Sequence, residues 1–180
     1  PRAMYLPERL NARGIDLADR TELAMLAERM AAADERRLTA GPIIGGEERA
    51  GEAERDVASP ADLRHVVGRA SDATLSDIED ALSAAVGAAA EWASTPVETR
   101  AACLERAAGL LEAEMPRLMT FLVSEAGKTI ADALAEVREA ADFCRYYAAR
   151  ARLDFAGPQQ PPVELGAGGA VFACVSPWNF

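Results

Sequence analysis

The sequence is poor in the residue types that build metal centres and disulfide frameworks. Its three cysteines, Cys103, Cys144 and Cys174, lie tens of residues apart in apolar surroundings, and His65 is its one histidine. Zinc sites and disulfide-stabilised domains need such residues at short spacings, and no CxxC pair occurs. We therefore expect no metal site, reduced and mostly buried thiols, and a structural or surface position for His65.

Long apolar runs are also scarce, and cations are outnumbered by anions. Asp and Glu outnumber Lys and Arg by 29 to 19, which gives a net charge of −10. No stretch approaches the roughly 20 apolar residues that a membrane span requires, and no signal peptide is visible. A surface that follows nucleic-acid phosphates needs clustered cations. We therefore expect an acidic, soluble, cytoplasmic protein that neither binds nucleic acid nor spans a membrane.

The chain is long enough for one ordinary domain, or for the opening third of a larger α/β enzyme. It begins at Pro1 without an initiator methionine and stops at Phe180, soon after an apolar run. We interpret it as a fragment of a longer protein.

Short elements are expected before residue 70. Residues 1–40 start polar and arginine-rich and then place Leu23, Leu26 and Met30 at i, i+3, i+7 spacing, which predicts a linker and a short amphipathic helix. A strand closed by a glycine turn, an exposed loop and a second strand are predicted at residues 42–46, 47–56 and 63–67.

The stretch from residue 71 to about 152 predicts four helices. Ser76 and Glu79 have capping-box spacing, and residues 95–98 combine a threonine cap with a proline and a glutamate that favour helix initiation. Pro116 restarts the pattern, and Gly127 is expected to end the third helix in a left-handed conformation. One apolar face is predicted on the first helix at Ile78, Leu82, Val86 and Ala89, and on the second at Val97, Ala101, Leu104, Ala108 and Leu111.

The longest helix is predicted at residues 129–152, and the four helices are expected to pack as a bundle-like layer. Its buried stripe should consist of Ile130, Leu134, Val137, Ala141, Cys144 and Ala148. Residues 157–169, rich in proline and glycine, predict a loop that encloses a short strand at 163–165. The unbroken apolar run at 170–175 is typical of a parallel strand buried on both faces.

The residues that follow this run occupy the place where open α/β sheets bind ligands. Asn179 can donate its side-chain amide to an oxyanion that forms when a nucleophile attacks a carbonyl. It can equally cap a following helix, with Trp178 and Phe180 in the core.

A family resemblance bears on this choice. The strand-end motif of the aldehyde dehydrogenase superfamily is similar to the last residues here, Val175, Ser176, Pro177, Trp178, Asn179 and Phe180. Further matches follow in the expected order at Trp92, Thr95, Pro96 and Arg100, then at residues 125–128. Residues 135–148 resemble the long helix of proline utilization A proteins, and residues 5–17 resemble their connector, with Leu10 where arginine is common.

The resemblance implies the N-terminal part of an α/β aldehyde dehydrogenase fold, in which a helical layer precedes the first buried strand of a Rossmann-type parallel sheet. Residues 1–40 would follow a proline dehydrogenase barrel that is absent here. Residues 41–180 would begin the NAD-binding aldehyde dehydrogenase domain. Matching is weaker between about 18 and 70.

Site roles follow from the same resemblance. Asn179 would stabilise the oxyanion formed when a cysteine thiolate attacks the aldehyde, Phe180 would wall the aldehyde tunnel, and Glu136 would lie near the substrate entrance. The NAD site would be lined largely by the backbone of Val175, Ser176, Pro177 and Trp178.

Plainer interpretations stay open for several of these residues. Glu136 can be a solvated helix charge like Glu139 and Asp142. For Lys128 a helix-end cation is favoured over a catalytic lysine. The aromatic residues of the long helix are more often packing residues than a substrate box; they are Phe143, Tyr146 and Tyr147.

The implied reaction is NAD-dependent oxidation of L-glutamate γ-semialdehyde to L-glutamate through a cysteine thiohemiacetal. The cysteine, the general base and the glycine-bearing NAD turn would follow Phe180, so this fragment alone is expected to be inactive. FAD would belong to the absent proline dehydrogenase part, and the partners would be the aldehyde substrate, the rest of the polypeptide and, in a homo-oligomer, further copies. An aldehyde dehydrogenase of other specificity and a non-catalytic helical interaction fragment are the alternatives.

Overall fold

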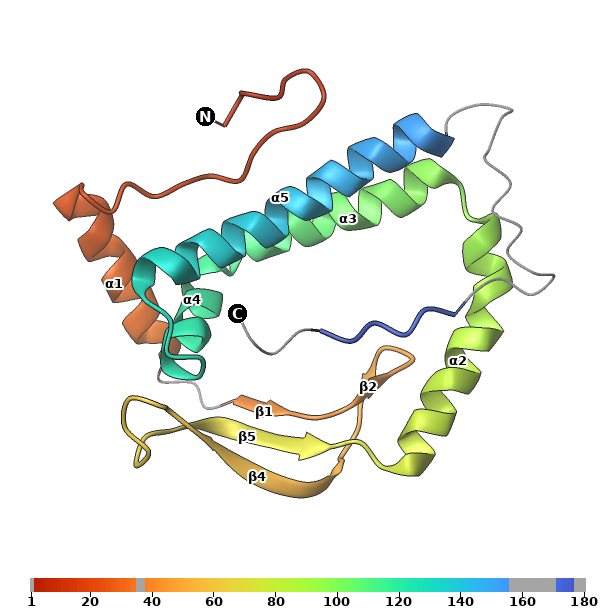
Figure 1. Cartoon of the computed structure of the whole chain (residues 1–180), viewed down its shortest axis with the longest axis horizontal. Coiled ribbons are helices and arrows are strands. Elements are labelled where there is room, and N and C mark those ends of the chain that lie inside the picture. The colour runs from red at the N-terminus through yellow and green to blue at the C-terminus, as the bar shows by residue number, and fades with distance from the viewer. Residues whose placement is uncertain (1, 35–37, 156–170, 177–180) are drawn as a thin grey trace.

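The structure is a computed structural model, and it describes residues 2–34, 38–155 and 171–176. Helices and strands are both present, as expected (Figure 1). The helices are α1 (Arg20–Asp34), α2 (Leu75–Ser94), α3 (Val97–Ala113), α4 (Met115–Ser124) and α5 (Ile130–Phe155). The strands are β1 (Leu38–Ala40), β2 (Ile43–Ile44), β3 (Glu47–Glu48), β4 (Glu52–Ala58) and β5 (Val66–Asp72).

The core lies among the helices α1, α3, α4 and α5. Helices α3 and α5 run side by side (Figure 1), and the fully buried Ala108 and Ala141 let their backbones approach closely. Helix α4 packs on α5 and α1 packs on α4. The larger buried cluster between them consists of Leu26, Met115, Met119, Ala133, Leu134 and Val137. The predicted stripe of α5 is thus confirmed at Leu134, Val137, Ala141 and Ala148, while Ile130 and Cys144 are half-buried. On α1 the predicted apolar face is confirmed at Leu26, whereas Leu23 is 40% exposed.

The predicted end of α4 at Gly127 is also confirmed. Gly127 has a φ of 68°, a conformation that glycine adopts without a Cβ penalty. Its N–H donates to the Val123 carbonyl at 3.2 Å, and the Lys128 N–H donates to the Leu122 carbonyl at 3.0 Å. The turn therefore satisfies the last carbonyls of α4 and leads directly into α5.

The strands form a small mixed sheet in the order β1-β5-β4, with β1 parallel and β4 antiparallel to β5. The prediction of a loop at 47–56 is wrong, because β3 and most of β4 lie there. Strand β4 has no apolar alternation to reveal it; its backbone pairs with β5, and ion pairs between exposed side chains add to that pairing. Arg69 contacts Glu54 at 3.2 Å and Asp56 at 3.1 Å.

Two further strand predictions have different outcomes. The strand predicted at 63–67 instead starts at Val66 and extends to Asp72, because the preceding residues form a turn in which the His65 N–H donates to the Asp62 carbonyl at 2.8 Å. The glycine turn after residues 43–44 is confirmed, since Gly45 and Gly46 have φ values of 63° and 88° and join β2 to β3. Positive φ at both loop residues is what a two-residue hairpin with a type I′ turn requires.

Helix α2 departs from the predicted helical layer. Its capping box uses Thr74 and Asp77, two residues earlier than the predicted Ser76 and Glu79. Thr95 does not cap α3; its hydroxyl donates to the Glu91 carbonyl at 2.9 Å, at the end of α2. In Figure 1 α2 stands apart from the α3/α5 pair, so the expected four-helix layer is wrong for this helix.

The apolar run near the C-terminus is not a buried strand in this structure. Residues 171–176 are extended and pair with no strand that the structure describes. Phe172 is 78% exposed and Val175 is 88% exposed.

Cys174 is exposed as well, whereas Cys103 and Cys144 are half-buried, which corrects the expectation of mostly buried thiols. A parallel strand is buried only when other strands pair with it and helices cover it. Among the described residues, no strand pairs with residues 171–176 and no helix covers them. The loop predicted at 157–169, with its strand at 163–165, and Ala170 lie outside the described residues.

Candidate functional site

The predicted cofactor and aldehyde residues fall at the end of the chain, where only two are described. Val175 and Ser176 are exposed and extended. Pro177, Trp178, Asn179 and Phe180 lie outside the described residues, so their predicted roles stay predictions. The predicted roles of Val175 and Ser176 stay predictions too.

Glu136, the predicted entrance residue, belongs to an ion pair that sequence reasoning missed. It lies on α5, and its Oε1 accepts from the Lys128 Nζ at 2.6 Å. The Lys128 side chain is 20% exposed and that of Glu136 is 40% exposed. The turn at Gly127 and the start of α5, where the Thr129 hydroxyl accepts from the Asp132 N–H, bring the two side chains together. Lys128 therefore acts as the partner of Glu136 as well as a cation beyond the end of α4.

The segment expected to be a linker is docked on the helices. We call residues 5–17 the connector. Ala12 is 2% exposed and packs against Ala108 and Ala141. Its N–H donates to Asp142 Oδ1 at 2.6 Å, and the Arg13 N–H donates to Glu112 Oε1 at 2.6 Å. Two helix carboxylates thus accept from backbone groups of the connector, one of them the N–H of the buried Ala12.

Glu112 is the electrostatic centre of this docking. Its carboxylate also forms an ion pair with Arg145, and both side chains are only 16–17% exposed. Burial alone would raise the pKa of the Glu112 carboxyl, but the Arg145 guanidinium and the Arg13 N–H outweigh burial and hold that pKa below its usual value. Glu112 is therefore ionised at neutral pH. No sequence signal marks this pair, because its members are 33 residues apart on different helices.

The aromatic residues of α5 pack on one another at the surface. The rings of Phe143 and Tyr147 stack with centroids 6.1 Å apart, and those of Tyr146 and Tyr147 meet edge to face at 5.2 Å. The connector's Arg9 lies over the Tyr5 ring at 4.1 Å and over the Tyr146 ring at 5.8 Å. All three rings are exposed, so they pack on one another at the surface rather than in the core, and the interpretation of them as packing residues stays a prediction.

Other chemistry is sparse in the part of the chain that the structure describes. His65 is exposed, which agrees with the surface position that was one of the two expected for it. Within residues 2–34, 38–155 and 171–176, no three His, Cys, Asp or Glu side chains are grouped so that they could hold a metal ion. Over the same ranges, no helix is both long and apolar enough to span a membrane.

Comparison with known proteins decides the family. The model of the aldehyde dehydrogenase family matches residues 47–180. The chain belongs to the aldehyde dehydrogenase family. The match begins after β2 and includes the helices α2 to α5 and the final motif, so the family resemblance inferred from that motif is confirmed.

Relatives of this aldehyde dehydrogenase chain match all of it or most of it. The bifunctional protein PutA of Klebsiella aerogenes is 41% identical over all 180 residues, and that of Salmonella typhimurium is 42% identical over the same span. The chain covers 13% of each of these proteins. The 1-pyrroline-5-carboxylate dehydrogenase 2 of Bacillus subtilis is 37% identical over 147 residues, which are 77% of this chain and 28% of that protein.

Solved structures agree with these relatives. Proline utilization A from Bdellovibrio bacteriovorus, inactivated by N-propargylglycine, has a TM-score of 0.78 and 28% identity over 83% of this chain and 16% of its own. The R100A mutant of Thermus thermophilus 1-pyrroline-5-carboxylate dehydrogenase has a TM-score of 0.76 and 29% identity over 97% of this chain and 32% of its own. The expected aldehyde dehydrogenase fold is thereby confirmed.

Proposed function

We propose that this chain serves an enzyme of proline catabolism that oxidises L-glutamate γ-semialdehyde to L-glutamate with NAD. One observation carries the proposal: identity to bifunctional PutA proteins of 41–42% runs through all 180 residues. It includes the connector, which precedes the residues that the family model matches. Relatives named 1-pyrroline-5-carboxylate dehydrogenase add support over shorter spans.

Asn179 is the residue of this chain to which we assign chemistry. Its side-chain amide donates to the oxygen of the aldehyde as a cysteine thiolate from beyond Phe180 attacks the carbonyl carbon. Donors that are already oriented toward a developing oxyanion act in a dry site without reorganising. Phe180 would wall the aldehyde tunnel and exclude water from it. The attack gives a thiohemiacetal, and after oxidation water hydrolyses the resulting thioester.

NAD supplies the hydride acceptor when it is bound. The residues that we propose to line its site are Val175, Ser176, Pro177 and Trp178. Val175 and Ser176 fit such a role, because both residues are exposed and their backbone belongs to no helix or strand that the structure describes. Peptide N–H and carbonyl groups that are free of a sheet can bind a polar ligand without loss of other hydrogen bonds.

Glu136 would lie near the substrate entrance, where its ion pair with Lys128 would orient its carboxylate. A carboxylate held at 2.6 Å from an ammonium has one preferred orientation, whereas a solvated glutamate samples many. Lys128 would then be a positioning residue that fixes Glu136.

The larger protein follows from the same relatives. We propose that residues 1–40 lead from a proline dehydrogenase region that binds FAD into the aldehyde dehydrogenase domain that begins at about residue 41. We further propose a cytoplasmic, bifunctional homo-oligomer. The docked connector supports a fixed junction between the two regions, because its backbone is bound to α3 and α5.

NADH formation by the full-length gene product tests the substrate. We expect a kcat/KM for L-glutamate γ-semialdehyde well above that for propanal. The assay should include 2,5-dioxopentanoate, because a Saccharolobus solfataricus relative named for that substrate is 31% identical over 128 residues. If 2,5-dioxopentanoate or propanal is oxidised as efficiently, the proline assignment is wrong.

Asn179→Ala tests the oxyanion role. Loss of one oxyanion donor lowers kcat about 100- to 1,000-fold. Asn179→Asp, which keeps the size and replaces the donor by a negative acceptor, should be at least as slow. Both variants should retain NAD affinity, measured by fluorescence titration. A kcat near that of the unmodified enzyme in Asn179→Ala would exclude the role.

A further inference from the structure

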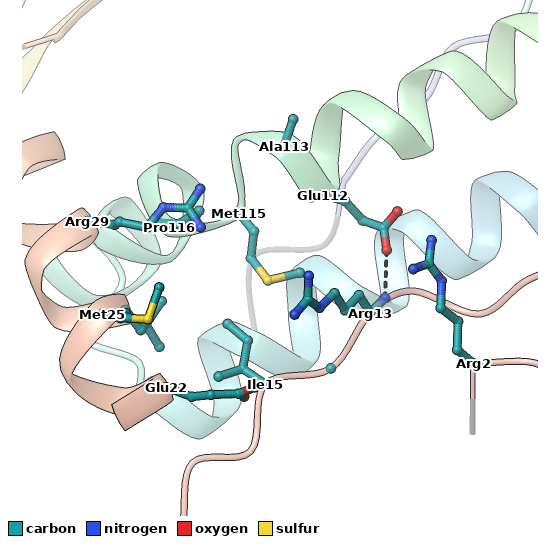
Figure 2. Close-up of a pocket in the computed structure, with 12 residues that line it drawn as sticks. Arg2, Arg13, Ile15, Glu22, Met25, Arg29, Glu112, Ala113, Met115 and Pro116 are labelled. Carbon is teal, nitrogen blue, oxygen red and sulfur yellow. Dashed lines mark hydrogen bonds between the residues drawn. The ribbon is translucent and has the colours of Figure 1, made fainter. Parts of the chain in front are cut away.

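A hollow of about 560 Å³ lies where the N-terminal segment, α1 and the α3–α4 junction meet (Figure 2). It is distant in sequence from residues 175–180, and none of the roles proposed above uses it. Its volume falls within the range that small-molecule sites have in proteins.

The middle of the hollow is apolar. Met115, which is 5% exposed, contributes its side chain between α3 and α4, and Ile15 of the connector and Met25 of α1 lie nearby (Figure 2). Met25 is 59% exposed. Apolar surface of this kind is covered favourably by the methylene chain of a ligand.

Arginine side chains stand at the sides of the hollow. In Figure 2 Arg29 lies on one side of Met115 and Arg13 on the other, with Arg2 beyond it. Among the residues that the structure describes, none of the three guanidinium groups makes an ion pair or donates a hydrogen bond. The contact of Arg13 with Glu112 comes from its backbone N–H.

The two carboxylates of the hollow already have partners. Glu22 accepts from the Asp16 N–H at 2.8 Å. Glu112 accepts from the Arg13 N–H and pairs with Arg145. Arg2 also acts on Glu112 through its charge, so Arg13 and Arg29 are the two guanidinium groups of the hollow for which the described residues show no partner, in a chain whose net charge is −10.

We propose that this hollow binds an aliphatic dicarboxylate. One carboxylate would meet the Arg13 guanidinium and the other would meet Arg29, while the methylene chain would lie over Met115. A guanidinium presents paired N–H donors that match the two oxygens of a carboxylate. Two such groups on opposite sides of an apolar middle select a ligand with two anionic ends, which distinguishes it from phosphate or a fatty acid.

Calorimetric titration of the full-length gene product with glutarate tests the site. The variants are Arg13→Gln and Arg29→Gln, and the matched control is Arg20→Gln, which removes an exposed arginine of α1 outside the hollow. Neither test substitution removes a hydrogen bond that the structure records for the side chain. We expect each test variant to weaken glutarate binding about tenfold and the control to leave it within about twofold.

Butyrate and inorganic phosphate complete the titration. Butyrate keeps one carboxylate and should bind at least about tenfold more weakly than glutarate. Phosphate that binds as tightly as glutarate and competes with it would overturn the dicarboxylate class. Equal glutarate affinity in all four proteins would place its binding elsewhere, and no binding to the unmodified protein would also refute the site.

Discussion

Helices α5 and α2 carry similar apolar stripes and meet different surroundings. On α5, Leu134 and Val137 are 6% and 4% exposed, because α3 and α4 pack against that helix and Leu26 of α1 joins the same buried cluster. On α2, the matching stripe is open, with Leu82 at 55% and Val86 at 62% exposure. Periodicity identifies which face of a helix is apolar, and the neighbouring elements decide whether that face is buried.

The two helices also differ in the contacts that they make with earlier parts of the chain. Helix α5 receives the connector, whose Ala12 N–H binds Asp142 on its surface. Helix α2 is held at its start by the Thr74 and Asp77 capping box, and Arg49 pairs with its Asp80 at 2.6 Å. A capping box and one ion pair with a residue 31 positions earlier thus hold the start of α2, whereas packing against α3 and α4 holds α5 along its length.

The largest effect is expected for Leu134→Ala on α5. Removal of a buried leucine side chain leaves a cavity, so the free energy of unfolding should fall by about 3 kcal/mol. Urea unfolding of this chain, followed by circular dichroism, measures the loss. A loss below about 1 kcal/mol would show that the α5 core can collapse around the gap.

Glu112→Gln should follow, with a loss of about 2 kcal/mol at neutral pH, because it leaves Arg145 largely buried without its counter-charge. The folded pKa of Glu112 is below its usual value of 4.5, so the ionised form stabilises the fold fully above about that pH. The difference between the two proteins should shrink as the pH falls through the folded pKa. A difference that is constant from pH 7 to pH 3 would contradict the assignment.

Asp142→Ala should cost about 1 kcal/mol and release the connector. Hydrogen exchange at the Ala12 amide should become faster, because that N–H loses its acceptor. Glu139→Ala is the matched control, since Glu139 lies on the same helix, is exposed and has no recorded partner. Equal exchange in the two variants would mean that Asp142 does not hold the connector.

The smallest effect is expected for Leu82→Ala on α2, at about 0.5 kcal/mol or less. It removes the same side-chain atoms as Leu134→Ala, so the difference between the two losses measures the effect of burying the leucine. The measurement should be repeated in the full-length gene product. A loss near that of Leu134→Ala would show that the α2 stripe is covered there.

Local signals predicted the helices well and the strands poorly. Gly127 ended α4 as expected, because a left-handed C-terminus depends on that residue alone. Strand β4 was interpreted as a loop, because its alternation is polar on both sides and its stabilising ion pairs depend on β5. The capping box was displaced by two residues, since Ser76 and Thr74 offer similar hydroxyls and only the geometry of the helix start selects one.

The candidate site shows the same division. The final motif and the order of matches before it indicated the aldehyde dehydrogenase family, which the family comparison confirmed. The Lys128–Glu136 pair and the hollow between Arg13 and Arg29 had no sequence signal. Lys128 and Glu136 lie 8 residues apart, and Arg13 and Arg29 lie 16 residues apart. In each case the turn between the two segments brings the side chains to the same place.

The sequence alone therefore determined the family, most helix positions, the apolar face of each helix and the turns at Gly45, Gly46 and Gly127, because these depend on residues close together in the chain. The tertiary structure decided which face is covered, how the connector docks and which charges pair. Those features arise from contacts such as Ala12 with Asp142, across 130 residues, whose energy depends on distances that no local pattern encodes.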